Sequence, residues 1–105
     1  MTIYAMRAAS PEYLNEVVEK MQTLGTPEIK AVFDGEAYWS LKGSHRIAAA
    51  EKLGLIPRIV EVSLEDEVLN EDIETDKLTP GKTYTAKEIC DEVYSSAIFT
   101  RQYIF

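Results

Sequence analysis

The chain has 105 residues, 46% of them hydrophobic and 28% charged, which is the composition of one globular domain rather than of a disordered chain. It has no apolar run of about 18 residues, we expect no secretory leader, and its single cysteine, Cys90, excludes an internal disulfide and an all-cysteine metal site. These features predict one cytoplasmic domain over residues 1–105 with no membrane contact.

The net charge of −7 is concentrated in one segment, because residues 61–76 hold eight of the eighteen acidic residues and no Lys or Arg. Proteins that bind nucleic acid usually present a basic face to the phosphates, so this charge disfavours DNA as a partner. We expect the segment to be a solvated loop with a helical turn around Leu64–Leu69. Its acids, with Glu36 and Glu51, are alternatively candidates for binding Mg²⁺ or for deprotonating a substrate hydroxyl.

The first 27 residues predict a strand followed by a helix. Ile3–Met6 reads as a short strand, and residues 10–12 (Ser-Pro-Glu) supply a hydroxyl N-cap, a first-turn proline and a first-turn acid. Gly25 and Pro27 end the helix. Apolar residues at helical spacing predict one buried stripe, formed by Leu14, Val17, Val18, Met21 and Leu24.

A β-hairpin is predicted next, from strands at Glu28–Val32 and Glu36–Lys42 around an Asp-Gly pair. The apolar residues of both strands share a face only if the loop has an odd number of residues. We therefore expect a three-residue loop, residues 33–35, with Gly35 in the left-handed conformation. The expected core face then comprises Ile29, Ala31, Ala37, Trp39 and Leu41.

The remaining elements alternate helix and strand. A helix is predicted over Ser44–Leu53, capped by Gly54, and a strand over Pro57–Val62. Residues 79–81 read as a turn, and residues 85–88 (Thr-Ala-Lys-Glu) match a capping box that opens a last helix. The predicted order is β-α-β-β-α-β-α, an α/β (mixed α+β) domain in which helices flank a small mixed sheet.

The strand–helix junction Gly43–Arg46 is the chemically suggestive part of the chain. Free N–H groups and the helix dipole stabilise an anion at the first turn, and Gly43 lets a ligand approach the backbone. Ser44 and His45 add hydrogen-bond donors, and Arg46 has the planar fork that binds phosphate bidentately. Lys42 adds a point charge. We interpret these five residues as a phosphate-binding turn.

A structural interpretation of the same residues stays open. In it Ser44 is a helix N-cap, Gly43 a turn residue and Arg46 a solvated charge. Trp39 is expected to pack in the core, with stacking on a nucleobase as the alternative. Because His45 is the only histidine, we expect no metal site.

Residues 11–62, and above all IKAVFDGEAYWSLKGSHRIAAAEKLGLIPRIVEV, resemble the ParB/sulfiredoxin-like family (ParB N-terminal domain-like). That family has a helix, a hairpin with a DG-type turn, a G-x-H/R-R turn, an alanine-rich helix ending in LG, and an Ile/Val-rich strand. The resemblance implies that the turn binds a nucleotide, such as ATP, ADP or CTP with Mg²⁺. It places Gly43, His45 and Arg46 at phosphate-binding positions and Ser44 where sulfiredoxins carry their nucleophilic cysteine.

Several residues depart from that pattern. Serine at position 44 removes the thiolate that sulfinic-acid reduction needs, and Cys90 is far away in the sequence. Ala48 replaces a further arginine of partition proteins, Lys42 stands where many members carry an acid, and residues 63–105 show only the acidic segment and a helix. We therefore expect neither sulfiredoxin nor chromosome-partition activity. Free-serine kinases and proposed nucleases share the scaffold, so phosphoryl transfer or hydrolysis stays open, and no catalytic residue is assigned.

The leading hypothesis is a bacterial or phage domain that binds a nucleotide or another phosphorylated small molecule through residues 42–46. The alternative is a non-catalytic interaction module that uses the acidic segment or the aromatic C-terminus to bind a protein partner. Phe99, Tyr103 and Phe105 would then form a contact surface, or a homodimer contact, instead of packing on the core.

Overall fold

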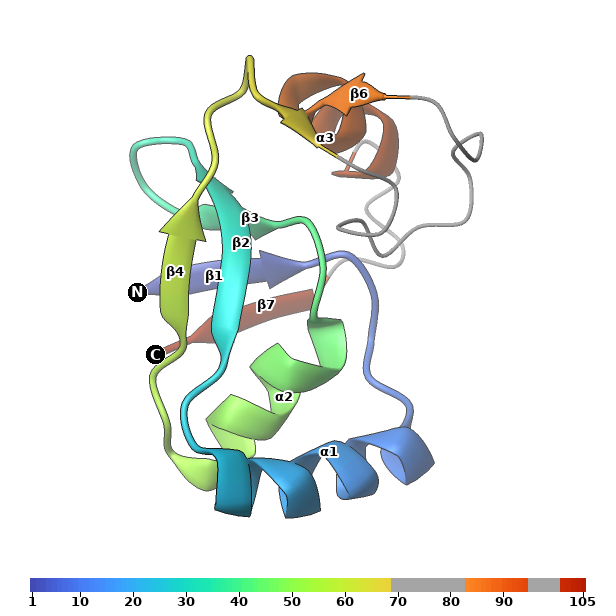
Figure 1. Ribbon diagram of the computed structural model, residues 1–105, viewed down its shortest axis with the longest axis vertical. Helices are drawn as coiled ribbons and strands as arrows, with labels where there is room; N and C mark the ends of the chain where they lie inside the picture. Colours follow the sequence, from blue (N-terminus) through green and yellow to red (C-terminus); the bar gives the residue numbers. More distant parts are fainter. Residues whose placement is uncertain (69–82, 95–100) are drawn as a thin grey trace.

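A computed structural model describes residues 1–68, 83–94 and 101–105 (Figure 1). The predicted order of elements is confirmed from the first strand to the fourth, and so is the later helix; three short strands were not predicted. The elements are β1 (Thr2–Ala5), α1 (Pro11–Leu24), β2 (Glu28–Phe33), β3 (Tyr38–Ser40), α2 (Ser44–Leu53), β4 (Arg58–Glu61), β5 (Glu67–Val68), β6 (Tyr84–Thr85), α3 (Ala86–Tyr94) and β7 (Arg101–Ile104).

The main sheet is mixed and has the strand order β4-β2-β3-β1-β7. β1 pairs parallel with β3 and antiparallel with β7, while β2 pairs antiparallel with β3 and parallel with β4. Figure 1 shows β2 and β4 running across the direction of β1 and β7, so the sheet is strongly twisted. The two ends of the chain meet, because Met1 and Phe105 exchange two main-chain hydrogen bonds of 2.8 Å. The fold class is therefore a small α+β domain with a mixed sheet.

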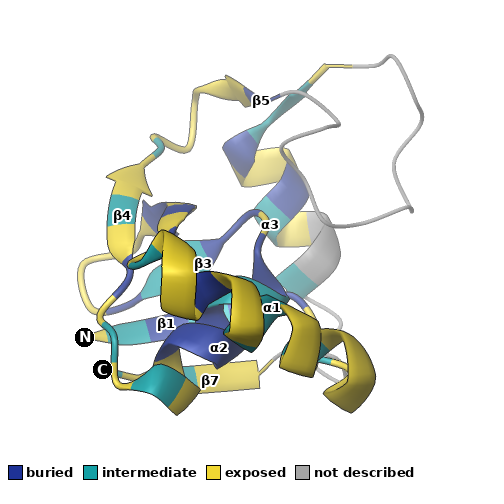
Figure 2. Cartoon of the chain, turned by 60° about the horizontal axis from the view of Figure 1, so that its bottom comes forward, coloured by how far each residue is buried: buried dark blue, intermediate teal, exposed yellow. Residues whose placement is uncertain are grey.

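One face of the sheet packs against α2, and α1 packs against α2 below the sheet (Figures 1 and 2). The central core consists of fully buried Ile3, Ala5, Ile29 and Ile47, with Tyr103 and Phe105 packed against it. The C-terminal residues Tyr103 and Phe105 thus pack on the core, and the position of Phe99 lies outside the described residues. A second cluster joins α3 to the sheet through Met6, Leu41, Val68 and Ile89.

The predicted odd-residue hairpin loop is wrong. Ala31 lies opposite Ser40, and Phe33 lies opposite Tyr38, so four residues, 34–37, connect β2 to β3. Because opposite residues share a face, Trp39 faces the side of the sheet away from Ala31.

The side chain of Asp34 explains the longer loop. Its Oδ1 accepts hydrogen bonds from the main-chain N–H groups of Glu36 (2.8 Å) and Ala37 (2.7 Å), and its Oδ2 accepts one from Trp39 Nε1 at 2.8 Å. These three bonds close a four-residue loop that the Asp-Gly pair alone does not indicate.

Helix α1 has its predicted bounds, but its apolar stripe is shorter than expected. Met21 forms a buried cluster with two alanines of α2, Ala49 and Ala50. Leu14, Val17 and Val18 pack against this cluster, whereas Leu24 is 81% exposed. The helix ends at Gly25, whose N–H donates to Met21 O. The last residue of the predicted stripe therefore faces solvent.

The predicted capping box of α3 is confirmed. Thr85 N–H donates to Glu88 Oε1 at 3.2 Å, and Glu88 N–H donates to Thr85 Oγ1 at 3.3 Å.

The helical turn expected around Leu64–Leu69 is wrong over its described part. There, a turn closed by the hydrogen bond from Asp66 N–H to Ser63 O leads into β5. The turn predicted at residues 79–81 lies outside the described residues. Among the described helices, none has the length and apolar character needed to cross a bilayer.

Candidate functional site at the start of α2

Gly43 forms the sharp junction between β3 and α2. It has φ 98° and ψ 31°, the left-handed region that favours glycine, and its carbonyl accepts the first helical bond from Ile47 N–H at 2.9 Å. A Cβ atom at this position would lie 3.0 Å from Arg46 Nη2 and 3.0 Å from Ile29 Cδ1. The first turn of α2 has no acidic residue and no side-chain cap. The predicted strand–turn–helix geometry is confirmed, with Gly43 rather than Ser44 as the N-cap.

Ser44 is fully buried at the first position of α2. Its Oγ accepts a hydrogen bond of 3.4 Å from the main-chain N–H of Arg7, in the loop between β1 and α1. The hydroxyl therefore faces that loop, and a ligand outside the domain does not reach it.

His45 connects the starts of the two helices. Its Nε2 accepts a 3.0 Å hydrogen bond from the main-chain N–H of Ser10, whose Oγ lies 3.5 Å away, and the Tyr13 ring meets the imidazole edge-on at 4.6 Å. An imidazole nitrogen that accepts an N–H bond carries its lone pair there, so this contact uses the neutral ring with the proton on Nδ1. His45 thus positions the start of α1.

Arg46 reaches in another direction, toward β2. Its Nη1 donates a 3.0 Å hydrogen bond to the main-chain carbonyl of Glu28. β3 ends at Ser40, and Leu41 N–H still donates to Lys30 O at 3.0 Å. β3 thus no longer supplies main-chain donors to β2 at Glu28, and the Arg46 guanidinium supplies the hydrogen bond there instead.

The side chains of residues 44–46 consequently diverge. Successive residues of an α-helix point about 100° apart, and these three contact the β1–α1 loop, the N-terminus of α1 and the beginning of β2, respectively. The interpretation from the sequence implied that these side chains meet around one ligand, and in the structure they do not.

Two of the five predicted residues do come together, with a third cation that the sequence interpretation missed. Lys42 and Arg46 line a pocket of about 330 Å³ with Lys30, Glu28 and Val60, which we call the turn pocket. Lys30 alternates with the buried residues Ile29 and Ala31 along β2, so strand periodicity places it on the opposite face. That alternation was the signal available in the sequence.

The turn pocket is cationic. Three of its five lining side chains are basic, and its single acid, Glu28, has Oε2 3.6 Å from Arg58 Nη2 outside the pocket. The Arg46 guanidinium carries five N–H donors, and within the described residues it makes one hydrogen bond, to the Glu28 carbonyl. The pocket therefore brings together three basic side chains of the kind that bind anions.

Trp39 does not line the turn pocket. It is half-buried, stacks on Tyr4 with ring centroids 4.2 Å apart, and meets the Tyr94 ring edge-on at 4.8 Å. The expectation of a core position is therefore wrong in part, because the ring lies on the sheet face away from α1 and α2.

Hydrogen bonds from Ala37 N–H, from the Trp39 indole and from Glu36 N–H hold the pKa of Asp34 below its ordinary value.

The other chemical candidates lie away from the turn pocket. Glu36 and Glu51 are exposed and do not line it, and residues 69–76 of the acidic segment lie outside the described residues. Residues 1–68, 83–94 and 101–105 contain no cluster of His, Cys, Asp or Glu that could hold a metal ion. Burial, and secondarily the charge of Asp91, raises the pKa of the Cys90 thiol to about 11.

Comparison with protein-family models, curated proteins and solved structures finds no match to this chain. The resemblance to the ParB/sulfiredoxin-like family therefore stays a prediction from the motifs of residues 11–62.

Proposed function

We propose that this domain binds a phosphate-bearing small molecule, with a nucleotide as the foremost candidate, in the turn pocket. The observation that carries the proposal is the convergence of Lys30, Lys42 and Arg46 on one pocket beside Gly43, in a chain whose net charge is −7. Basic side chains gathered at one pocket raise the local concentration of anionic ligands there.

The roles of the predicted residues change in this proposal. Lys42 and Arg46 contact the ligand and Lys30 joins them, while Gly43 lets the Arg46 side chain lie close against the main chain. Ser44 and His45 act as positioning residues, because they hold the β1–α1 loop against α2. The proposal concerns binding. Phosphoryl transfer or hydrolysis would also require a base or a Mg²⁺ ligand. Glu28 is the one acid that lines this pocket, and its Oε2 lies 3.6 Å from Arg58 Nη2.

The alternative, a protein-interaction module, predicts Arg46 bonded to an acid and an exposed aromatic C-terminus. Arg46 instead bonds a main-chain carbonyl, and Phe105 packs on the core. These two contacts favour the ligand-binding proposal.

Thermal unfolding with ATP, ADP, CTP, GTP and inorganic pyrophosphate, each with Mg²⁺, tests the proposal. A ligand at about a hundred times its Kd adds roughly 2.7 kcal/mol, which raises Tm by several degrees in a domain of this size. We expect Lys30→Gln and Lys42→Gln to remove most of the ligand-induced shift, measured against each variant's own ligand-free Tm.

Lys52→Gln is the matched control, because Lys52 is an exposed lysine in the last turn of the same helix. It should leave the ligand-induced shift unchanged. No shift with any compound at millimolar concentration, or an equal loss in Lys52→Gln, would overturn the proposal. A positive result justifies an assay for phosphate release.

A further inference from the structure

A second pocket lies on the other side of Arg46, between α1 and the segment that leads into β2. It has a volume of about 330 Å³, and we call it the helix pocket. Its lining residues are Tyr13, Val17, Lys20, Met21, Leu24, Gly25, Thr26, Pro27 and Arg46. This volume is at the lower end of the range found for small-molecule sites in proteins.

The lining combines apolar and basic side chains. Tyr, Val, Met, Leu and Pro side chains make up the apolar part, while Lys20 and Arg46 are the charged members and no acid takes part. Within the described part of the chain, neither Lys20 nor Arg46 forms an ion pair. Arg46 donates a hydrogen bond to the main-chain carbonyl of Glu28. A pocket of this kind matches a molecule with an apolar body and one negative charge.

Side chains that folding leaves exposed gather at this pocket. Leu24 is 81% exposed and Tyr13 is 51% exposed, although both are large and apolar. Gly25, at the end of α1, has no atom within 4 Å of the position where a Cβ would stand, so the pocket is open beside the backbone. Exposed apolar groups around an open hollow indicate a surface that a ligand can cover.

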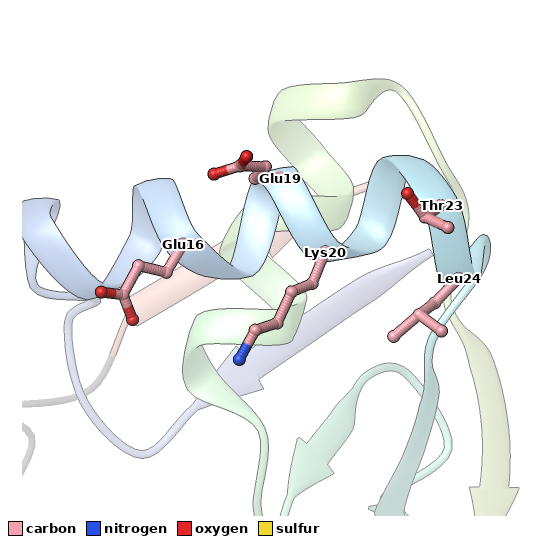
Figure 3. A pocket seen from close by; sticks show the side chains of 5 residues that line it. All are labelled: Glu16, Glu19, Lys20, Thr23 and Leu24. Atoms are coloured by element: carbon pink, nitrogen blue, oxygen red, sulfur yellow. The ribbon is translucent and has the colours of Figure 1, made fainter.

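The neighbouring hollow along α1 differs in charge. It is lined by Glu16, Glu19, Lys20, Thr23 and Leu24, so two acids accompany its single cation (Figure 3). Figure 3 shows Lys20 and Leu24 extending to the same side of α1, as their spacing of four residues requires. One cation and one exposed apolar side chain therefore lie together in the lining of the helix pocket.

We propose that the helix pocket is a binding site for a small amphipathic carboxylate, a molecule with an apolar ring or chain and a single carboxylate. The apolar body covers Val17, Met21 and Leu24, and the carboxylate lies between Lys20 and Arg46. This site is separate from the turn pocket and does not depend on phosphate binding there. Arg46 lines both pockets.

The test compares three probes by ¹H–¹⁵N NMR titration: 2-naphthylacetate, its neutral amide and acetate. We expect the naphthylacetate to shift the amide resonances of residues 13–27 with a submillimolar Kd. The neutral amide should bind at least tenfold more weakly, because it lacks the charge. Acetate should not saturate, because it lacks the apolar body.

Lys20→Gln and Leu24→Ser should each weaken naphthylacetate binding by fivefold or more. The matched controls are Lys87→Gln, an exposed lysine on α3, and Ile56→Ser, an apolar residue that is 64% exposed outside the pocket. Both should bind as the unmodified domain does. Circular dichroism of each variant verifies that it is folded.

Three outcomes would overturn the inference: equal affinity for the acid and the amide, shifts centred outside residues 13–27, or equal effects of test and control variants. Resonances of the same residues that move with protein concentration alone would show that a second copy of the chain covers this face instead. Loss of pyrophosphate binding in Lys42→Gln with naphthylacetate binding retained would support two separate sites.

Discussion

Arg46 Nη1 donates a 3.0 Å hydrogen bond to the main-chain carbonyl of Glu28, at the point where β3 no longer pairs with β2. A charged side chain thus replaces a main-chain donor and joins α2 to the first residue of β2. The same residue lines both the turn pocket and the helix pocket. Its structural and ligand-binding roles must therefore be measured separately.

Replacing Arg46 with glutamine should lower the free energy of unfolding by about 1 kcal/mol, because the Glu28 carbonyl loses its donor. Urea denaturation followed by circular dichroism measures this change. Arg58→Gln is the control, since Arg58 pairs with the carboxylate of the same Glu28 at 3.6 Å in an exposed position. An exposed pair contributes little, so the control should change stability by less than about 0.5 kcal/mol. Equal effects in the two variants would show that the Arg46 bond contributes nothing specific.

Replacing Gly43 with alanine should destabilise the domain by roughly 2–4 kcal/mol, through positive-φ strain and the close approach to Arg46 and Ile29. Gly35→Ala separates the two causes. Gly35 also has a positive φ, 101°, but a Cβ there meets no atom within 4 Å. We expect Gly35→Ala to cost about 1 kcal/mol, and a thermal melt of both variants gives the difference. Similar losses for the two variants would mean that the turn relaxes around a Cβ at position 43.

The Asp34 carboxylate should make stability depend on pH in the acidic range. Its pKa is lower in the folded protein than in the unfolded chain, so its contribution is present above the unfolded value of about 3.9. That contribution is lost as pH falls through the folded pKa. Urea midpoints measured from pH 6 to pH 2.5 should therefore fall less steeply in Asp34→Asn than in the unmodified domain. Glu36→Gln, which changes the neighbouring exposed carboxyl of the same loop, should retain the steeper fall.

The Cys90 thiol should react slowly with iodoacetamide while the domain is folded. Burial raises its pKa to about 11, and the thiolate is the nucleophile, so the reactive fraction at pH 8.5 is roughly a hundredfold lower than in the unfolded chain. Because the pKa is higher in the folded state, the protonated thiol contributes to the stability of the fold when the pH is below the ordinary cysteine pKa. That contribution is lost as the pH rises toward 11. Mass spectrometry of alkylation with and without 6 M guanidinium measures the ratio. Equal rates would mean that the thiol is accessible in the folded state.

The sequence by itself determined the elements that rest on local interactions. Ser10, Pro11 and Gly25 indicate the bounds of α1, Gly43 and Gly54 those of α2, and the Thr85–Glu88 capping box the start of α3. Each of these signals involves residues at most four positions apart, so a short segment of sequence is enough to locate the end of a helix. The mixed composition of strands and helices followed from the same local patterns.

Only the tertiary structure decided which side chains meet. The hairpin register depends on three hydrogen bonds of Asp34, and β7 forms only because the distant β1 supplies its partner. The four-residue motif at 43–46 looked like one site in the sequence, yet helical geometry separates its side chains. Lys30 lies near Lys42 and Arg46 because β2 runs beside the segment that joins β3 to α2. Such pairings follow from the packing of elements far apart in the chain, which local sequence patterns do not contain.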